Sequence, residues 1–487
     1  MYHYMTAHQL AEEIRKGNAS ASEIARSAMD RIERLDPEIG AYITATGDRA
    51  LEAANRVDER LAKGEAVPPL AGIPMAIMDN ICTQGILTTC ASRMLYNFIP
   101  PYSADAYERL EQAGSVLTGK TNLDEFGIGS STQGSAFKKT YNPWDLGKVP
   151  GGSGGGAAAA VAAGMAAFAL GTDTGGSIRQ PSAMCGVVGM KPTYGRVSRH
   201  GLVAFASSMD QAGVVTRDLR DCALVLNHIC GYDPRDSMSA NVAVPDFRAG
   251  LGEGIKGFKI GIPSEYFGEG TEQGIKERVQ EAVKVIEGLG AACDEVSLPH
   301  TEYALSAYYI ISSAEASSNL ARYDGIRYGY KAEDYTDLEE LFVKSRSQGF
   351  GEEVERRVII GTYFLTSGKL DVYFIKAQKV RALVKADFDR AFEYYDLLVC
   401  PTSPVAAYSD QPAGKGDGHP LNTCLPHTFT IPASLAGLPA LSIPCGFSGG
   451  LPVGLQFIGK PFDEEALLRA AYAYEQSTNF HTMHPQV

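Results

Sequence analysis

The chain has 487 residues, of which 45% are hydrophobic, and a formal net charge of −13. This acidic balance argues against a long nucleic-acid footprint, because phosphate binding needs clustered Lys and Arg. No apolar run approaches the roughly eighteen residues needed to cross a bilayer. With no signal-peptide pattern over residues 1–6, we expect a soluble, cytoplasmic protein that binds neither nucleic acid nor membrane directly.

The nine cysteines are odd in number, and none forms a Cys-x-x-Cys pair. They lie in apolar segments such as residues 397–400, which favours buried free thiols over a disulfide framework or a zinc site. We therefore expect no metal and no cofactor.

Two amphipathic helices are predicted at the start of the chain. Thr6 with Gln9, and Ser20 with Glu23, have the spacing of a capping box, and apolar residues follow both pairs at helical intervals. Asp36-Pro37 is predicted to end the second helix.

From about residue 71 onward, short apolar runs alternate with helical stretches. This alternation indicates an α/β domain with a mainly parallel or mixed sheet buried between helices. The predicted strands are Pro74 to Met78, Val116 to Thr118, Ala167 to Leu170 and Val187 to Met190.

The second half of the chain is predicted to be largely helical until residue 396. After a helix over 217–230 and a polar surface stretch over 233–254, helices are predicted over 272–289, 303–320 and 371–392. Strands return at 397–400, 440–444 and 453–458, and Asp463 begins a closing helix. These late strands most simply complete the same sheet. We therefore expect one domain, made of N-terminal helices (1–65), a core (about 66–230), a helical elaboration (about 255–395) and closing strands with a helix (396–487).

A glycine-rich segment admits a nucleotide-binding interpretation. Gly152, Gly154 and Ala157 fit the loose dinucleotide fingerprint. The preceding residues 142–150 are rich in helix and strand breakers, however, where a buried strand would be required. A loop that leads into a helix is therefore the favoured interpretation.

Several segments in chain order carry a family resemblance. Gly72-Ile73-Pro74 precedes Asp79-Asn80, and the segments Val149-Pro150-Gly151-Gly152-Ser153 and Gly175-Gly176-Ser177-Ile178-Arg179-Gln180-Pro181 follow. Together they resemble the amidase signature family, and within it the amidotransferase A subunits, over nearly the whole chain. The resemblance implies an α/β amidase-signature fold, in which helices cover both faces of a mixed sheet. It also implies B-like and C-like subunits as candidate partners.

In this family, a nucleophilic serine, a second serine after a cis peptide bond and a lysine form the catalytic triad. By motif match, Ser177 takes the place of the nucleophile and Ser153 that of the bridging serine, whereas Met78 stands where the family has lysine. The backbone N–H groups expected to hold the oxyanion are those around Thr174, Gly175 and Gly176.

Met78 removes the proton acceptor of that triad. A thioether is a weak hydrogen-bond acceptor and carries no exchangeable proton, so it can neither take a proton from Ser153 nor return one to a leaving group. Loss of a triad member costs on the order of a millionfold in turnover. We therefore predict that glutaminase activity by the usual route is lost or very slow. Lys120, Lys148 and Lys191 are the candidate replacements as base.

The resemblance also implies a substrate pocket. In the amidotransferase A subunits, an arginine holds the α-carboxylate of glutamine and an aspartate holds its α-amine. Arg357 matches the arginine and Tyr308 a pocket tyrosine, but His427 stands at or near the aspartate. Because an imidazole offers an ammonium no negative charge, free glutamine is not a secure substrate.

These departures leave three hypotheses open. The chain is an amidase or amidotransferase relative that acts on a carboxamide or an acyl group through an acyl-Ser177 intermediate, which includes a repurposed acyl-transfer or amide-forming enzyme. Alternatively, it is a non-catalytic paralogue that binds a ligand or assembles with other subunits. Thirdly, Met78 is an engineered inactivating change. The departures from the family pattern at Gly154, Gly156 and His427 argue against the third hypothesis, since a designed change normally alters one residue.

Overall fold

The computed structural model describes residues 2–409 and 424–487, and these residues form one 11-stranded sheet. The strands are β1 (Tyr42–Ala45), β2 (Pro74–Met78), β3 (Val116–Thr121), β4 (Phe168–Asp173), β5 (Val188–Lys191), β6 (Gln211–Thr216), β7 (Lys259–Pro263), β8 (Ala292–Val296), β9 (Leu397–Pro401), β10 (Ala440–Ser448) and β11 (Leu451–Gly459). Their spatial order is β1-β3-β2-β4-β6-β5-β10-β11-β9-β7-β8.

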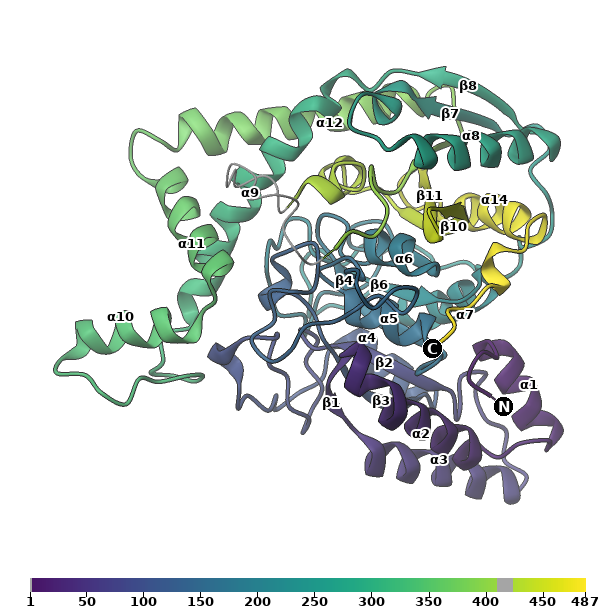
Figure 1. The fold of residues 1–487 in the computed structure, drawn as a ribbon, viewed down its shortest axis with the longest axis horizontal. Helices are drawn as coiled ribbons and strands as arrows, with labels where there is room; N and C mark the ends of the chain where they lie inside the picture. Colours follow the sequence, from purple (N-terminus) through teal and green to yellow (C-terminus); the bar gives the residue numbers. More distant parts are fainter. Residues whose placement is uncertain (1, 410–423) are drawn as a thin grey trace.

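The helices lie around this sheet (Figure 1). They are α1 (Ala7–Lys16), α2 (Ala21–Ile39), α3 (Gly47–Ala62), α4 (Asp105–Gln112), α5 (Gly155–Ala162), α6 (Arg179–Cys185), α7 (Leu219–Ile229), α8 (Gln273–Gly288), α9 (Ala304–Asn319), α10 (Leu338–Gly349), α11 (Glu352–Leu365), α12 (Lys376–Ala391), α13 (Ile431–Leu435) and α14 (Glu464–Gln476). None of these helices is long and apolar enough to cross a membrane.

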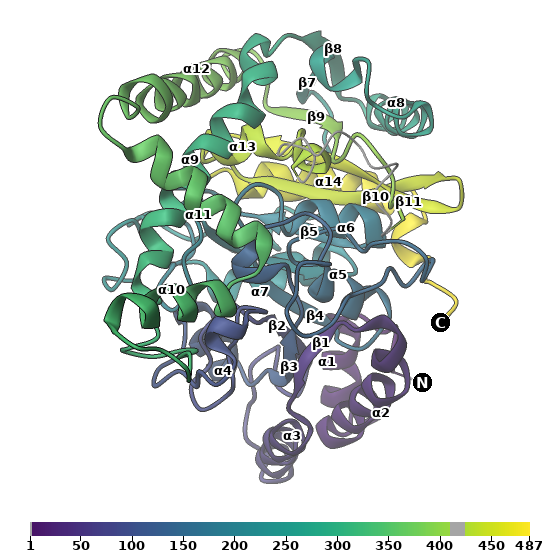
Figure 2. The same cartoon turned by 60° about the vertical axis from the view of Figure 1, so that its left-hand side comes forward.

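The sheet is mixed, as predicted. Strand β2 pairs in parallel with β3 and β4, whereas β4 pairs antiparallel with β6, and β5 antiparallel with β6 and β10. Helices α5 and α6 pack on each other and on the sheet. A second group, made of α7, α8 and α14, also packs on the sheet. The two groups cover the sheet as layers of an α/β fold (Figure 2).

The strands at the centre of the sheet are buried along their whole length. Every residue of β2, β4 and β6 is buried, which explains why β2 reads as a continuous apolar run in the sequence. Helix α5 consists of glycine, alanine and one valine, all buried, and these small side chains let it lie close to the strands. The signature loops are thereby anchored on rigid elements.

Most predicted elements form, with one correction near the N-terminus. Both capping boxes are present, since Thr6 N donates to Gln9 Oε1 at 3.0 Å and Ser20 N to Glu23 Oε2 at 2.9 Å. The prediction that Asp36-Pro37 ends the second helix is wrong. Proline removes one N–H, but Asp36 O still accepts from Gly40 N at 2.8 Å, and the helix ends at the left-handed Gly40.

The late strands complete the same sheet, as expected. Strand β10 pairs with β5 and β11, and β11 pairs with β9. Strands β1, β6, β7 and β8 were not predicted. The division into a single domain with the boundaries given above stays a prediction.

Helices α9 to α12 extend from the sheet as an arm (left of Figure 1). The arm carries several exposed large apolar side chains, among them Ile359 at 70% and Val372 at 57% exposure, and Leu383 at 45%. Single exposed apolar residues are ordinary, but a group on one arm is a feature of association surfaces.

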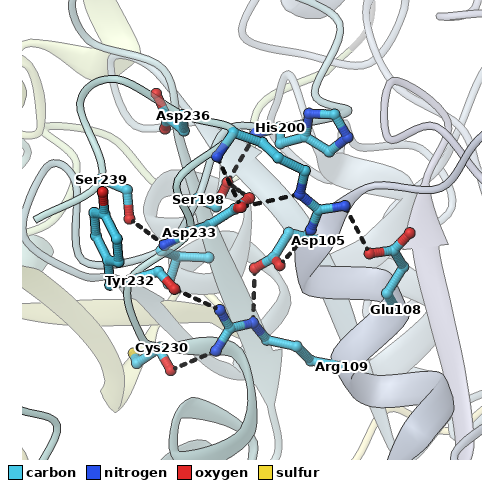
Figure 3. A network of polar contacts seen from close by, with 12 residues as sticks. Asp105, Glu108, Arg109, Ser198, His200, Cys230, Tyr232, Asp233, Asp236 and Ser239 are labelled. Carbon is cyan, nitrogen blue, oxygen red and sulfur yellow. Dashed lines mark hydrogen bonds and ion pairs between the residues drawn. The ribbon is translucent and has the colours of Figure 1, made fainter. Parts of the chain in front are cut away.

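The polar stretch after α7 is held against α4 by ion pairs (Figure 3). Arg235 contacts Asp105 at 2.7 Å and Glu108 at 3.1 Å, and Arg109 from α4 donates to Asp105 at 2.7 Å and to Cys230 O at 3.1 Å. Asp105 therefore joins the two guanidinium groups and fixes the start of this surface stretch.

Candidate active site

The sheet brings the predicted triad positions together. Strands β2 and β4 are parallel neighbours, so their carboxyl ends lie at the same edge. Met78 is the last residue of β2, and the loop with Ser177 follows the end of β4. Ser153 precedes α5, which packs on both strands.

Met78 is fully buried, and its thioether fills the space between two neighbouring segments. Its Sδ lies 3.5 Å from Thr172 N and 3.8 Å from Thr172 Oγ1. A Cβ added to Gly154 would come within 3.2 Å of the same sulfur. The small residue at 154 and the thioether at 78 therefore fit one another.

Ser153 has a buried hydroxyl without a hydrogen-bond partner among the described residues. The peptide bond before it, Gly152–Ser153, is cis, as the family resemblance implies. The backbone is well fixed, because Ser153 O accepts from Asp124 N at 3.1 Å. The Oγ atom, which the resemblance implies would meet the family lysine, has no hydrogen-bond partner among the described residues.

The turn before Ser177 exposes a row of backbone donors. The N–H groups of Gly175, Gly176 and Ser177 donate a hydrogen bond to no other residue in the part of the chain that the structure describes. Thr430 Oγ1 donates to Gly175 O at 2.6 Å, and Gly154 N donates to Ser177 O at 3.0 Å. Fixed carbonyls with free N–H groups are what an oxyanion site requires.

Two buried carboxylates, Asp173 and Asp210, bind residues on either side of this turn. Thr174 Oγ1 donates to Asp210 at 2.7 Å, and Asp173 forms a buried ion pair with Arg179 at 2.9 Å. Burial favours the neutral acid, but the Arg179 guanidinium outweighs it and lowers the pKa of Asp173. Arg179 also donates to Gln456 Oε1 at 2.8 Å, which ties the turn to β11.

His427 lies against both serine-bearing loops. It belongs to a short 3-10 helix (Leu425–His427), it is 2% exposed, and its Nε2 lies 2.8 Å from Gly152 O. Since a carbonyl oxygen only accepts, the ring donates this bond. A Cβ on Gly176 would lie 3.3 Å from His427 Cδ2. Burial lowers the pKa of His427 to about 4, so the imidazole is neutral at neutral pH.

Tyr308 lies against the same turn, and Arg357 lies on α11 of the arm. The Arg357 side chain is buried, with Nε 2.9 Å from Glu353, Nη2 3.0 Å from Cys424 Sγ and Nη1 3.3 Å from Ser312 Oγ. A Cβ on Gly175 would lie 2.7 Å from Tyr308 Cζ. Of the three residues predicted to bind substrate, Tyr308 from α9 and His427 from the segment before α13 therefore lie against the Gly175-Gly176 turn, whereas the printed contacts of Arg357 from α11 are with Glu353, Ser312, Cys424 and the Tyr309 ring.

The lysines proposed as replacement bases bond elsewhere. Lys120 Nζ donates to Ile81 O and Thr88 Oγ1, both at 2.8 Å, and lies 3.4 Å from Asp79. Lys191 Nζ donates to Leu438 O at 2.5 Å, and burial lowers its pKa to about 7.

Lys148, the third candidate, reaches Ser409 Oγ at 3.3 Å on the surface. Within the described ranges, none of the three amines is hydrogen-bonded to the Ser153 hydroxyl.

Sequence reasoning missed three residues that shape the site. Asp210 holds Thr174, Thr430 holds Gly175, and Gln180 Oε1 accepts the N–H of Gly152 at 2.8 Å. Gln180 lies inside the signature segment, so its position in the sequence could have indicated a role in the site. Asp210 and Thr430 carry none, because only the fold brings them to the loop.

Comparisons with known proteins agree with this geometry. Residues 23–468 match the Amidase family. The A subunit of the glutamyl-tRNA(Gln) amidotransferase of Moorella thermoacetica is 57% identical over 485 residues, which cover 100% of this chain and 99% of that protein. Its counterpart from Heliobacterium modesticaldum is 56% identical over 482 residues, with 99% and 98% covered.

Solved structures give the same result. The A subunit of the glutamyl-tRNA(Gln) amidotransferase from Thermotoga maritima superposes with a TM-score of 0.82 at 41% identity, covering 100% of this chain and 98% of that chain. A peptide amidase in complex with the competitive inhibitor chymostatin superposes with a TM-score of 0.85 at 31% identity, with 100% of both chains covered.

Proposed function

Because the chain belongs to the amidase family, we propose that it acts on a carboxamide or acyl group through Ser177, with hydrolysis by the usual Ser-Ser-Lys route lost or very slow. One observation carries this proposal. A buried thioether occupies the lysine position, and the Ser153 hydroxyl is left without a partner among the described residues.

The arrangement separates acylation from proton transfer. With an ester or thioester donor, Ser177 Oγ forms the bond to the carbonyl carbon, the C–O or C–S bond breaks, and the serine proton leaves with the alcohol or thiol. The free N–H groups of Gly175 and Gly176 stabilise the negative oxygen between these two events. Ammonia leaves only after it has received a proton, and Met78 supplies none. An ester or thioester releases a better leaving group, so acyl transfer from such a donor depends less on the missing base.

Active-site labelling and an ammonia assay test the proposal on the purified chain. We expect a fluorophosphonate at high concentration to label Ser177 slowly, because fluoride leaves readily and takes the serine proton as hydrogen fluoride. Ser177→Ala should abolish labelling, and ammonia release from glutamine should stay near background. Absence of label on the folded wild type would contradict the proposal that Ser177 is the nucleophile. Rapid ammonia release by the wild type would contradict the proposal that hydrolysis by the Ser-Ser-Lys route is lost or very slow.

A second candidate function is assembly with B-like and C-like amidotransferase subunits. The relatives are named as A subunits, and the arm of helices α9 to α12 exposes Ile359, Val372 and Leu383. Co-expression with such subunits encoded in the same genome should give a complex that survives gel filtration. Ile359→Glu should weaken it, and Leu146→Glu, at an exposed position outside the arm, should not.

A further inference from the structure

We propose that Thr132 is a positioning residue for the reaction at Ser177, because its hydroxyl holds the loop that carries Ser153. The inference rests on the proposed function, in which Ser177 is the nucleophile. It concerns a residue that neither the triad nor the oxyanion turn includes.

The Thr132 hydroxyl lies at the centre of the Ser153 loop. Its Oγ1 lies 2.7 Å from Gly151 O and 3.1 Å from Ser153 O, so its single proton is directed at two carbonyl oxygens. The same oxygen accepts a hydrogen bond from Gly155 N at 2.9 Å. One side-chain atom therefore contacts the backbone before, at and after Ser153.

The fit between the hydroxyl and the loop is close. Thr132 is fully buried, and a Cβ added to Gly155 would come within 2.3 Å of its Oγ1. Gly155 is also the first residue of α5, so this helix begins directly against the hydroxyl. The loop cannot shift away from Thr132 without breaking these hydrogen bonds.

Thr132 adopts a backbone conformation that β-branched residues avoid. Its φ is +59°, in the left-handed region. A β-branched residue held there costs about 1–3 kcal/mol and persists only where the surrounding structure imposes it. Glycine would adopt this φ freely, but it has no hydroxyl to offer the loop. The strained threonine therefore points to a role for its oxygen in function.

A buried carboxylate imposes this conformation. Asp124 Oδ2 accepts from Thr132 N at 2.9 Å and from Ser131 N at 3.1 Å, and Oδ1 accepts from Gly134 N at 2.9 Å. Asp124 N donates to Ser153 O at 3.1 Å. Asp124 thus joins the segment of Thr132 to the loop of Ser153 by a second route.

The loop is in turn bonded to the segment of the nucleophile. Gly154 N donates to Ser177 O at 3.0 Å, and Gly152 N donates to Gln180 Oε1 at 2.8 Å in the first turn of α6. A displaced loop would therefore move Ser177 relative to the free N–H groups of the turn before it. A shift of about 1 Å in a reacting group can cost about 100-fold in rate.

The rate of fluorophosphonate labelling of the full chain, resolved into kinact and KI, tests this inference. Thr132→Val keeps the β-branched shape and removes the hydroxyl, whereas Thr132→Ser keeps the hydroxyl. Thr216→Val is the matched control, because Thr216 is fully buried and its hydroxyl donates to Asp218 O at 2.8 Å. Thr216 pairs with Phe168 at the start of β4, whereas the loop with Ser177 follows the end of that strand.

We expect kinact to fall by at least about 10-fold in Thr132→Val while KI stays within about 3-fold of the wild type. Thr132→Ser and Thr216→Val should keep kinact within about 3-fold of the wild type, although both valine variants lower the melting temperature. Thr132→Gly, which loses the hydroxyl and relieves the strain, should show the same fall in kinact and replaces Thr132→Val where that variant does not fold.

Wild-type kinact in either hydroxyl-free variant at position 132 would overturn the inference, as would an equal loss in Thr132→Ser or Thr216→Val. A wild type that takes no label would contradict the proposed function instead. Hydrogen–deuterium exchange then decides the inference by itself. Amides of residues 151–155 should exchange faster in the hydroxyl-free variants than in the wild type and in Thr216→Val, and equal exchange would overturn it.

Discussion

Placing an amine at position 78 is the most direct test of the proposed loss of proton transfer. The change is Met78→Lys. The position is fully buried, and its present side chain contacts Thr172 through Sδ at 3.5 Å. A lysine reaches one atom beyond the terminal methyl of methionine, and the Ser153 hydroxyl lacks a partner among the described residues. The site therefore has a group ready to bind the amine.

The expected magnitude follows from the same contacts. Removing a triad member costs about 10⁶ in turnover, which bounds what a restored lysine can regain. Gly154 in place of serine and the tight fit around Met78 imply an imperfect position for the amine. We therefore expect kcat/KM to rise by at least about 10³-fold, which corresponds to an activation barrier lowered by about 4 kcal/mol. Burying the amine should also lower the melting temperature, because desolvation of a charged group opposes folding.

The assay is ammonia release from glutamine, measured as kcat/KM, with Met78→Leu as the matched control, whose side chain carries no exchangeable proton. Burial lowers the pKa of a lysine, so the regained activity should rise with pH as the amine becomes neutral. The reasoning is refuted if Met78→Lys folds and accepts a fluorophosphonate at Ser177 but releases ammonia no faster than the control.

Three further predictions concern stability. Asp173→Asn should lower the free energy of unfolding in urea by about 3–5 kcal/mol, because it leaves the buried Arg179 guanidinium unpaired. Asp246→Asn, at an exposed ion pair, should lower it by less than about 1 kcal/mol. Similar losses for the two variants would contradict the view that the buried pair stabilises the fold more than the exposed one. Gly154→Ala should cost about 1–3 kcal/mol because its Cβ would lie 2.6 Å from a backbone oxygen, and Gly250→Ala, with nothing within 4 Å, should be neutral. With the pKa of His427 lowered to about 4, the unfolded state gains a proton first as pH falls below 6.5, so His427 should cost up to about 3 kcal/mol of stability between pH 6.5 and 4. Subtracting the pH profile of His427→Asn isolates this term, and a flat difference would rule it out.

The sequence predicts the central strands well because their physics is local. Strand β2 is buried on both faces, so a continuous apolar run between a proline and an aspartate is enough to find it. Strand β6 begins with glutamine, alanine and glycine and was missed, although it lies between β4 and β5. Its identity depends on the neighbours that bury it, which the sequence does not show.

The same distinction applies to the candidate site. Motif order was sufficient to predict that Ser153, Ser177 and Met78 lie at one edge of the sheet, and that His427 lies near them, beside Gly152 and Gly176. The binding role of His427 stays a prediction. Asp210 and Thr430 were not predicted, because their hydrogen bonds to the loop span 36 and 255 residues. The end of α2 was misplaced for a local reason, since one proline removes one donor and leaves the remaining carbonyl bonds intact.

The pairing of β5 with β10 has a consequence for biosynthesis. While the ribosome is still translating the second half of the chain, β5 presents an unpaired edge, and Arg179 lacks Thr430 and Gln456, its later partners. The nascent polypeptide therefore carries an unpaired strand edge until the late strands are made, and such edges favour aggregation. The turn before Ser177 gains its contacts with Thr430 and Gln456 only when the last part of the chain emerges, so a chain released early would lack them.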